Sequence, residues 1–374
     1  MYVRIGHIAV MLISAAFLTG GCTDRRALDA DGAEISFGVA TVRLEAETKL
    51  GGTLHVNFTD GDGDESKRSK IAVYAWHEQE RMKVFDNVVV RLEDDAQTLW
   101  SYSPKKKWRW GSGADSYDFL AVANPDAVTD IALPKQDLYV PSAEFPGNVH
   151  PVSRKDDDES PFTLSVSYDA TYAQYDLLMA GVRRSTSESN PSAKVPLVFQ
   201  HALSAVKVKF IKDSGGADFR VTAFHFYDLM VRADIEASLS PSLTFSKAAV
   251  EYSPDPEFGE EKSYDSATPV NTDNPTYEPY GADNWALLLP QSLRNGANGR
   301  PTLIVTFNTS SEVSYTREIR LDQILDEHGQ IIDEWLPGRK YVYEIHILMD
   351  GGVLVNVTTT PWEEVEAATP GLMI

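Results

Sequence analysis

An alternation of apolar and polar residues with a period of two is the feature that most limits what this chain can fold into. It is clearest in the stretch 195–210, VPLVFQHALSAVKVKF. There Val206, Val208 and Phe210 alternate with two lysines, so a strand would bury the apolar side chains on one face and leave the lysines in water. Another apolar run precedes it, separated by only the short link 200–204. We therefore predict that both runs are strands of one packed sheet unit.

Runs of this kind recur along the chain, whereas apolar residues at helical spacing are scarce. Tyr, Val, Thr and Trp, which favour strands, are frequent. The 374 residues give room for two ordinary domains, and 43% hydrophobic residues can form real cores. These observations predict an all-β protein with an N-terminal domain at 34–212, a C-terminal domain at 213–374 and a glycine-containing hinge at 212–216.

Strands are predicted wherever the alternation, or a continuous apolar run, is bounded by turn residues. The predicted strands span 35–43, 54–58, 71–76, 85–92, 98–102, 117–123, 175–180, 221–227, 243–252, 285–289, 302–307, 341–348 and 353–359, with one short helical turn at 321–325. Three antiparallel hairpins are expected: 54–58 with 71–76, 85–92 with 98–102, and 341–348 with 353–359. Residues 253–283, rich in Pro, Asp and Tyr, are expected to form a long surface loop.

The formal net charge of −21 argues against a polyanionic partner. Binding to nucleic acid draws mainly on the neutralisation of phosphates by basic residues, and this chain has 55 acidic residues against 34 basic ones. The same repulsion opposes close approach to an anionic membrane surface. Nucleic acid is therefore not an expected partner, and membrane attachment has to come from something other than a basic face.

Residues 1–21 have the features of a signal peptide. Arg4 supplies a short positive region, the apolar run 8–18 is too short to span a bilayer stably, and two small glycines precede Cys22. The polar, aperiodic segment 22–33 that follows is predicted to be a tether.

Cys22 is the only cysteine, which excludes an intramolecular disulfide. A lone cysteine after the small residues of a leader resembles a bacterial lipoprotein box, whose thiol is diacylated and becomes the first mature residue. One departure is that Leu18 lies four residues before Cys22, where the pattern usually has it three before. We predict lipidation at Cys22, which would hold the protein at a membrane. The alternative is an ordinary secreted protein with an incidental cysteine in its leader.

Three aspartates at alternate positions, Asp60, Asp62 and Asp64, invite comparison with a calcium-binding loop. The sixth position of such a loop needs Gly and holds Glu65, and the twelfth needs a bidentate Glu and holds Ile71. The segment is therefore interpreted as a solvated turn between strands. Whether the aspartates bind a cation stays open, and no metal site is predicted.

Lysines stand beside tryptophans in the segment 103–110, SPKKKWRW. Exposed Trp108 and Trp110 could stack on sugar rings or nucleobases. The preferred interpretation is that the rings pack on a sheet and the charges stay outside. A solvent-exposed, coplanar pair of rings would support a surface glycan-binding lipoprotein, whereas burial of both rings would remove that alternative.

An enzyme is not predicted. The chain contains no Gly-x-Ser-x-Gly elbow, no His-Glu-x-x-His motif and no phosphate-binding glycine loop. Its eight histidines are scattered, and His77 and Glu78 are followed by no second histidine at ligand spacing. A glycosidase-like pair of carboxylates stays open, because spacing along the chain does not fix spacing in space. No cofactor is expected.

Seven short motifs, each weak alone, follow one another in a fairly specific order. They are WSYSPK at 100–105 with Trp108, YDFLAVA at 117–123 with Asn124 and Pro125, DLLMA at 176–180, LVFQHALS at 197–204, LLLPQ at 287–291, PGRKY at 337–341 and VNVTTTPW at 355–362. Together with the lipoprotein leader, they resemble the fimbrillin family of Bacteroides-type bacteria, whose members build or decorate pili. The resemblance extends over most of the mature chain.

The resemblance implies two transthyretin-like Greek-key β-sandwich domains in tandem and assembly by strand donation. In that family a precursor reaches the outer membrane as a lipoprotein, a protease cuts after an arginine, and the first strand of the N-terminal domain leaves. A neighbouring subunit then fills the vacated groove with a strand of its own. Arg43 matches the cut site because it ends the predicted first strand, although it could be an ordinary strand-end arginine. Cuts at Arg25 or Arg26 would only clip the tether.

Residues 363–374, EEVEAATPGLMI, lack sustained alternation and contain Pro-Gly, so they make a poor donor strand. A subunit that accepts a strand without donating one would sit at the pilus tip. We therefore predict a tip or accessory pilus subunit at the outer membrane and cell surface. A lipid-retained pilus anchor and a surface glycan-binding lipoprotein are the alternatives. The expected partners are other pilus subunits, outer-membrane lipid through Cys22, and a host or microbial surface ligand, for which the loop 253–283 is the candidate surface.

Overall fold

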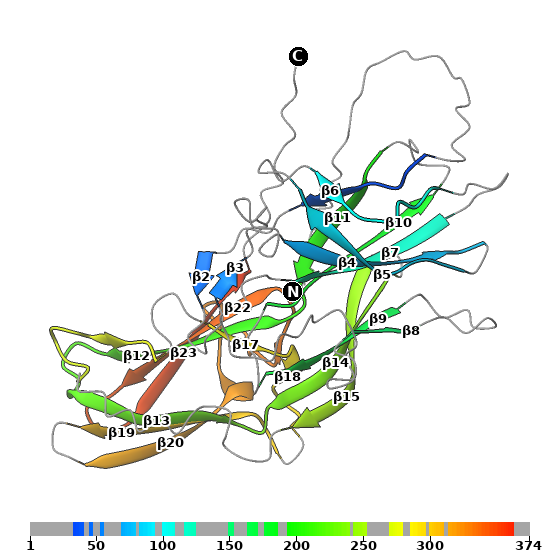
Figure 1. The fold of residues 1–374 in the computed structure, drawn as a ribbon. Coiled ribbons are helices and arrows are strands. Elements are labelled where there is room, and N and C mark those ends of the chain that lie inside the picture. The colour runs from blue at the N-terminus through cyan, green and yellow to red at the C-terminus, as the bar shows by residue number, and fades with distance from the viewer. Residues whose placement is uncertain are drawn as a thin grey trace, which may run out of the picture.

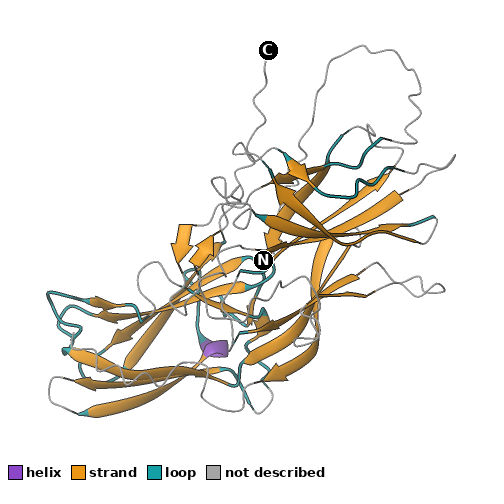
Figure 2. Cartoon of the chain, viewed as in Figure 1, coloured by secondary structure: helices purple, strands orange, loops and turns teal. Residues whose placement is uncertain are grey.

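The computed structural model describes residues 33–40, 45–47, 53–55, 69–79, 82–93, 99–108, 116–124, 149–152, 163–170, 176–185, 193–239, 242–252, 269–279, 285–296, 299–309 and 313–362. These residues are mostly strands and turns (Figure 1), and Figure 2 shows the one helical element among them, the 3₁₀ turn η3 (Leu321–Gln323). The prediction of an all-β protein is confirmed. None of the helical structure in these segments is long and apolar enough to cross a bilayer.

A seven-stranded sheet and a four-stranded sheet form what we call the first unit (Figure 1). The seven strands are, in order, β1 (Phe37–Ala40), β11 (Val195–His201), β10 (Leu178–Ser185), β7 (Ser116–Asn124), β4 (Lys70–His77), β5 (Met82–Leu92) and β6 (Trp100–Ser101). The four are β15 (Leu243–Tyr252), β14 (Met230–Leu239), β9 (Thr163–Asp169) and β8 (Val149–Val152). The sheets approach closely at Gly181, where an added Cβ would lie 2.9 Å from the Leu243 side chain. Glycine is therefore needed there for packing.

The second unit also has two layers. One is the sheet β16 (Thr276–Tyr277), β12 (Ser204–Lys212), β22 (Arg339–Ile347) and β23 (Val353–Pro361), with β17 (Ala286–Leu288) also paired to β12. The other contains β13 (Phe219–Tyr227), β19 (Thr302–Thr309) and β20 (Ser314–Arg320). Between the layers, Phe210 contacts Phe224 with ring centroids 6.1 Å apart. Two short pairs complete the described strands: β18 (Gln291–Ser292) with β21 (Glu334–Trp335), and β2 (Glu45–Glu47) with β3 (Thr53–His55).

Period-two patterning identifies several strands correctly. In β22, Tyr341, Tyr343, Ile345 and Ile347 are all buried, and β22 pairs antiparallel with β23 as predicted. The predicted hairpin of 85–92 with 98–102 is confirmed by the pairing of β5 with β6. The predicted hairpin of 54–58 with 71–76 is wrong. β3 pairs with β2, whereas β4 pairs with β5 and β7, because two apolar strands close in sequence need not be neighbours in a sheet.

The prediction that the two runs of 195–210 belong to one sheet is also wrong. β11 lies in the seven-stranded sheet, whereas β12 pairs in parallel with β22 in the second unit. The chain changes sheet at Ala202 and Leu203, where the amide of Ala202 donates to the carbonyl of Leu177 at 2.9 Å. Strand pairs thus cross the predicted boundary between 212 and 213. β12, before the boundary, pairs with β22, and β14, after it, pairs with β9. The two-domain division and its transthyretin-like topology stay predictions.

Lys207 is buried, contrary to the expectation that both lysines of β12 lie in water. Its ammonium lies 4.6 Å from the centre of the Trp285 ring and 3.4 Å from the carboxylate of Glu278. An aromatic face and an opposite charge offset the cost of removing the lysine from water. Lys209 is half-buried, with its ammonium 3.3 Å from Glu344.

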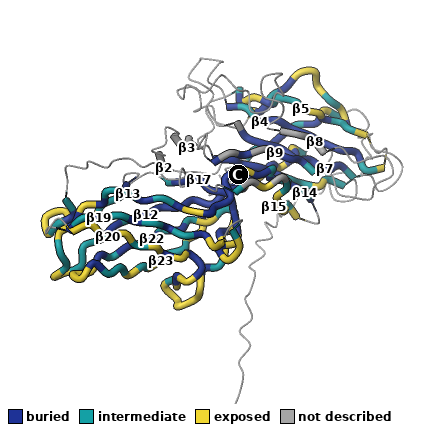
Figure 3. Tube along the Cα trace, turned by 90° about the horizontal axis from the view of Figure 1, so that it is seen from below, coloured by how far each residue is buried: buried dark blue, intermediate teal, exposed yellow. Residues whose placement is uncertain are grey.

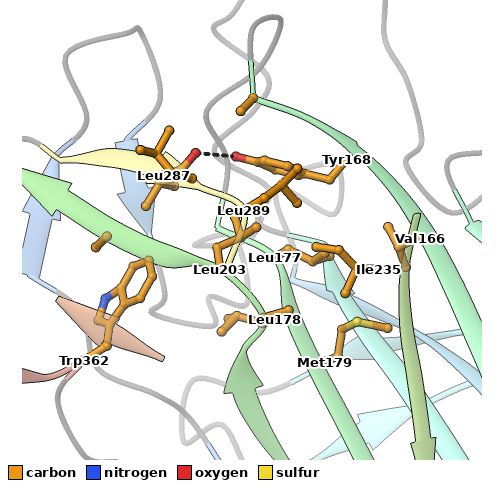
Figure 4. Packing of buried hydrophobic residues seen from close by; sticks show 14 of the residues in the cluster. Val166, Tyr168, Leu177, Leu178, Met179, Leu203, Ile235, Leu287, Leu289 and Trp362 are labelled. Atoms are coloured by element: carbon orange, nitrogen blue, oxygen red, sulfur yellow. Dashed lines mark hydrogen bonds between the residues drawn. The ribbon is translucent and has the colours of Figure 1, made fainter. Parts of the chain in front are cut away.

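The buried residues of the two units form one continuous apolar cluster. Figure 3 shows buried stretches of strand in both units. Figure 4 shows the region where the units meet, with Val166 and Tyr168 of β9, Met179 of β10, Ile235 of β14 and Leu287 of β17. The hydroxyl of Tyr168 donates to the carbonyl of Leu287 at 3.2 Å. We call this meeting region the seam.

Candidate functional site

The first described segment, 33–40, lies between two backbone edges. Its strand β1 pairs in parallel with β11, from Phe37 opposite Val195 to Ala40 opposite Val198. Its earlier residues pair antiparallel with 106–108: the amide of Ile35 donates to the carbonyl of Lys106 and the amide of Trp108 donates to the carbonyl of Ala33, both at 2.9 Å. We call the space that this segment fills the first-strand groove.

Two side chains of the segment point into the protein core, as the alternation of the predicted first strand requires. Ile35 and Phe37 are each 1% exposed, and Val39 is half-buried. The Phe37 ring lies 5.5 Å from Phe85, 5.7 Å from Tyr102 and 6.1 Å from Phe119, measured between centroids, in edge-on arrangements. Burial of each large apolar side chain contributes about 1.5–3 kcal/mol. The groove thus has an aromatic pocket for one residue of its strand.

Tyr102 connects the groove to the segment through a hydrogen bond. Its hydroxyl donates to the carbonyl of Ile35 at 2.8 Å and accepts from the amide of Lys106 at 3.1 Å. Burial raises the pKa of Tyr102, and the negative charge of Glu34 adds to this, while the hydrogen bond with the Lys106 backbone acts the other way. A tyrosine hydroxyl is already protonated at neutral pH and can donate, and the raised pKa extends this range to higher pH.

Trp108 lies beneath this pocket and is 1% exposed. Its ring contacts Tyr117 at 5.0 Å and Phe119 at 5.8 Å between centroids. Burial of Trp108 meets the condition for one of the two rings, so the exposed pair that would support a sugar platform is not formed. Trp110 lies outside the described residues.

Several predicted positions lie outside the residues that the structure describes: Cys22, Arg43, Asp60, Asp62, Asp64 and the segment 363–374. Within the described segments, no three His, Cys, Asp or Glu side chains gather as a set of metal ligands. The expected loop 253–283 is described only at 269–279. There Val270 is buried and exchanges main-chain hydrogen bonds with Phe219, and β16 pairs with β12. This part of the predicted loop is therefore attached to the second unit.

The comparisons with known proteins agree with this architecture. A model of the fimbrillin-like family matches residues 59–362. The chain belongs to the fimbrillin-like family. This is a family of structural, non-enzymatic proteins of cell-surface pili. The segment 33–40 precedes the matched residues, whereas Tyr102 and Phe119, which line the groove, lie within them.

Solved structures that align over most of this fimbrillin-like chain share little sequence with it. A fimbrilin (fimA) from Porphyromonas gingivalis W83 is 12% identical with a TM-score of 0.45, over 90% of this chain and 99% of that one. The tip fimbrial protein Mfa3 from Porphyromonas gingivalis, with a C-terminal truncation, is 13% identical with a TM-score of 0.40, over 81% of this chain and 97% of that one. No curated protein matches the chain.

The fimbrillin-like motifs gather at two places in the structure. The motifs at 100–108 and 117–123 contain Tyr102, Trp108 and Phe119, which line the first-strand groove. The other five meet at the seam, where they bring together three residues that the sequence analysis did not single out. Asp176, His201 and Trp362 each lie in a different motif, and motif membership was the only sequence signal for them.

Hydrogen bonds to the main chain hold the remaining seam motifs in place. The amide of Gly338, which has φ +67°, donates to the carbonyl of Leu203 at 2.8 Å, and the amide of Trp362 donates to the carbonyl of Gly338 at 2.8 Å. The Gln291 side chain accepts from the amide of Met230 at 2.7 Å and donates to its carbonyl at 3.3 Å. A non-glycine residue would be strained at the left-handed backbone of Gly338. The seam is thus built from residues far apart in sequence.

Proposed function

We propose that this fimbrillin-like protein is a tip or accessory pilus subunit, exported as a lipoprotein through Cys22 and assembled by exchange of its first strand. The observation that carries the proposal is the insertion of 33–40 between two backbone edges, above an aromatic pocket. A short segment held in this way can be replaced by another strand of similar pattern without rebuilding the rest of the sheet.

The groups that the segment would leave behind are those a donor strand can satisfy. They are the carbonyl of Lys106, the amides of Trp108 and Val195, the hydroxyl of Tyr102 and the pocket around Phe37. Unpaired main-chain groups and an apolar trough at a sheet edge favour pairing with a strand from another molecule. Strand pairing of this kind needs no cofactor.

Arg43 is the proposed cut site, because it follows three residues after Ala40, the last residue of β1. Cleavage there would separate the whole of β1 from the rest of the fold. A protein cut in this way would enter a pilus as a strand acceptor. Retention of both lipid and first strand would instead make the subunit a membrane anchor of the pilus.

The tip or accessory role is favoured over a stalk role by the composition of 363–374, which interrupts any alternation with Pro-Gly. The proposed partners are other pilus subunits, outer-membrane lipid and a surface ligand. Adhesion would then use parts of the protein other than the groove.

An arginine-specific protease applied to the folded chain tests the proposal. We expect preferred cleavage after Arg43, and uptake by the cut protein of a synthetic peptide with the sequence 33–42, AEISFGVATV. The same peptide with Asp at the Phe37 position is the control and should not bind, because a carboxylate would be buried in an aromatic pocket. Cleavage of Arg43→Gln at an unchanged rate, or equal uptake of both peptides, would contradict the proposal.

The mature N-terminus from surface fractions tests the same proposal in the cell. A mass corresponding to a start at Leu44 supports strand acceptance in a pilus. A diacylated Cys22 with 35–43 intact supports the anchor alternative and contradicts the tip role.

A further inference from the structure

Strand β11, the wall of the first-strand groove, is paired by different strands in its two halves. Residues 195–198 pair in parallel with β1, and residues 199–201 pair antiparallel with β10. If the β10 register continued, it would set Pro196 opposite Arg183, and proline has no N–H to give to a ladder. In the described part of the chain, residues 195–198 therefore pair with the first strand alone.

Loss of the first strand would leave this half of β11 held mainly by side-chain burial. Val195 and Leu197 are buried, whereas Pro196 and Val198 are exposed. The amide of Val195 donates to the carbonyl of Ser36 at 2.7 Å and would lose that acceptor. The half of β11 at 195–198 would then be attached to the sheet only through the C-terminal half of the strand, at 199–201.

That end of β11 is fixed by a buried cluster around His201. Its Nδ1 atom lies 2.9 Å from the carboxylate of Asp176, and the two residues are 5% and 2% exposed. An ionised carboxylate only accepts hydrogen bonds, so Nδ1 is the donor. The imidazole stacks on Trp362 with 4.2 Å between ring centroids and 2° between planes. The His201 side chain thus connects a residue two positions before β10, the end of β11 and the residue after β23.

Main-chain bonds attach the same point to both units. Just beyond His201, the amide of Ala202 donates to the carbonyl of Leu177 in the first unit, and the carbonyl of Leu203 accepts from Gly338 in the second. Figure 4 shows Leu203, Leu177 and Trp362 together in this region. The anchor is therefore independent of the first strand.

We infer that His201 is a positioning residue for strand exchange. It holds the C-terminal half of β11 in register while the first strand and the half at 195–198 open together as one unit. Because β11 stays fixed at one end, less of it has to become ordered when an incoming strand binds, which lowers the entropic cost of binding. The inference rests on the proposed function for its purpose, but the anchoring can be measured in the uncut chain, without assembly.

Hydrogen exchange of the intact protein, followed by mass spectrometry, is the first test. We expect peptides covering 35–40 and 195–198 to exchange at a common rate, and peptides covering 199–203 to exchange at least about tenfold more slowly. Equal protection on the two sides of Phe199 would overturn the inference, because 195–198 would then be held without the first strand.

Two variants of the anchor separate its parts. His201→Phe keeps a ring against Trp362 but leaves Asp176 without its donor, and His201→Gln keeps an amide donor but loses the stacking. We expect both to accelerate exchange of 199–203 towards the rate of 195–198, the first more than the second. The acceleration has to exceed that of 341–347 in β22, which reports any loss of global stability. If neither variant accelerates 199–203 beyond 341–347, the inference is overturned.

His346 offers a matched control. Its Nδ1 atom also contacts a carboxylate, that of Asp213 at 2.7 Å, but His346 lies on β22 and not at the end of β11. His346→Gln should leave exchange of 199–203 unchanged, and an equal acceleration would contradict a specific role of His201. These outcomes are independent of cleavage at Arg43. A protein that is never cut could still show the anchor, and a protein that takes up a donor peptide could lack it.

Discussion

The first-strand groove and the seam hold the same strand, β11, in different ways. In the groove, the segment 33–40 is held by main-chain hydrogen bonds, one tyrosine hydroxyl and two buried side chains. At the seam, a buried hydrogen bond between His201 and Asp176 and a stacked tryptophan join residues 176, 201 and 362. Main-chain bonds can be made by any strand of suitable alternation, whereas the seam depends on particular side chains. The chain therefore combines a replaceable contact with an irreplaceable one.

The largest effect that we predict is at the seam. His201→Ala leaves the Asp176 carboxylate buried without its donor, which costs about 3–5 kcal/mol, and it also removes the stacking on Trp362. Part of the loss should be global, because both units meet at this point, and it adds to the local opening of 199–203. Urea unfolding should show it as a lower midpoint with a similar slope.

His346→Ala is the control for this comparison. His346 is paired with Asp213, whose side chain is 41% exposed, so solvent can replace the lost partner. The expected cost is about 0.2–1 kcal/mol. If the two variants lost the same stability, burial at the seam would not be what makes its contact irreplaceable.

The next effect is at the groove and should be local. Phe37→Ala empties the pocket formed by Phe85, Tyr102 and Phe119, at a cost of about 3 kcal/mol. Opening of 33–40 should become about 100-fold more frequent, since each 1.4 kcal/mol corresponds to a factor of ten. Hydrogen exchange of that segment measures the change.

Val39→Ala is the matched control at the groove, because Val39 shares the face of Phe37 but is only half-buried. It should change exchange of the segment by a much smaller factor. The urea midpoint should move less for Phe37→Ala than for His201→Ala. A global loss at Phe37 as large as that at His201 would mean that the first strand is part of the irreplaceable core.

The sequence identifies strands better than it identifies their partners. Alternation placed β15, β22 and β23 correctly, because a period of two depends only on which face of a strand is buried. It could not show that β11 and β12 lie in different sheets, since a short link permits either a hairpin or a change of layer. Partner choice depends on contacts between distant residues, which no local pattern contains.

The groove could be predicted in part and the seam could not. The alternation at 35–39 gave the inward face of the first strand, and Ile35 and Phe37 are indeed buried. Nothing local distinguishes His201 from the other histidines, because its partners lie 25 and 161 residues away in sequence. Lys207 was misplaced for the same reason, since Trp285 covers it from a distant segment.

The smallest effect concerns the hydrogen bond between Tyr102 and Ile35. Tyr102→Phe removes the donor but keeps the ring against Phe37, so opening of 33–40 should become easier by about 1 kcal/mol, or roughly fivefold in exchange. Tyr227→Phe, at an exposed position on β13, should change nothing measurable. Loss of more than tenfold protection would mean that the hydroxyl, and not the apolar pocket, is the main hold on the first strand.

The same bond gives this effect a pH dependence. The pKa of Tyr102 is raised in the folded protein, so the folded state binds this proton more tightly than the unfolded state, in which a tyrosine titrates near 10. Its contribution is complete below about pH 10 and is lost as pH rises through the raised pKa. The difference in unfolding free energy between the wild type and Tyr102→Phe should therefore be constant from pH 6 to pH 9. It should shrink above about pH 10, the pKa of a tyrosine in the unfolded chain. A difference that already shrank between pH 6 and pH 9 would show that another group controls the contact of the first strand with its groove.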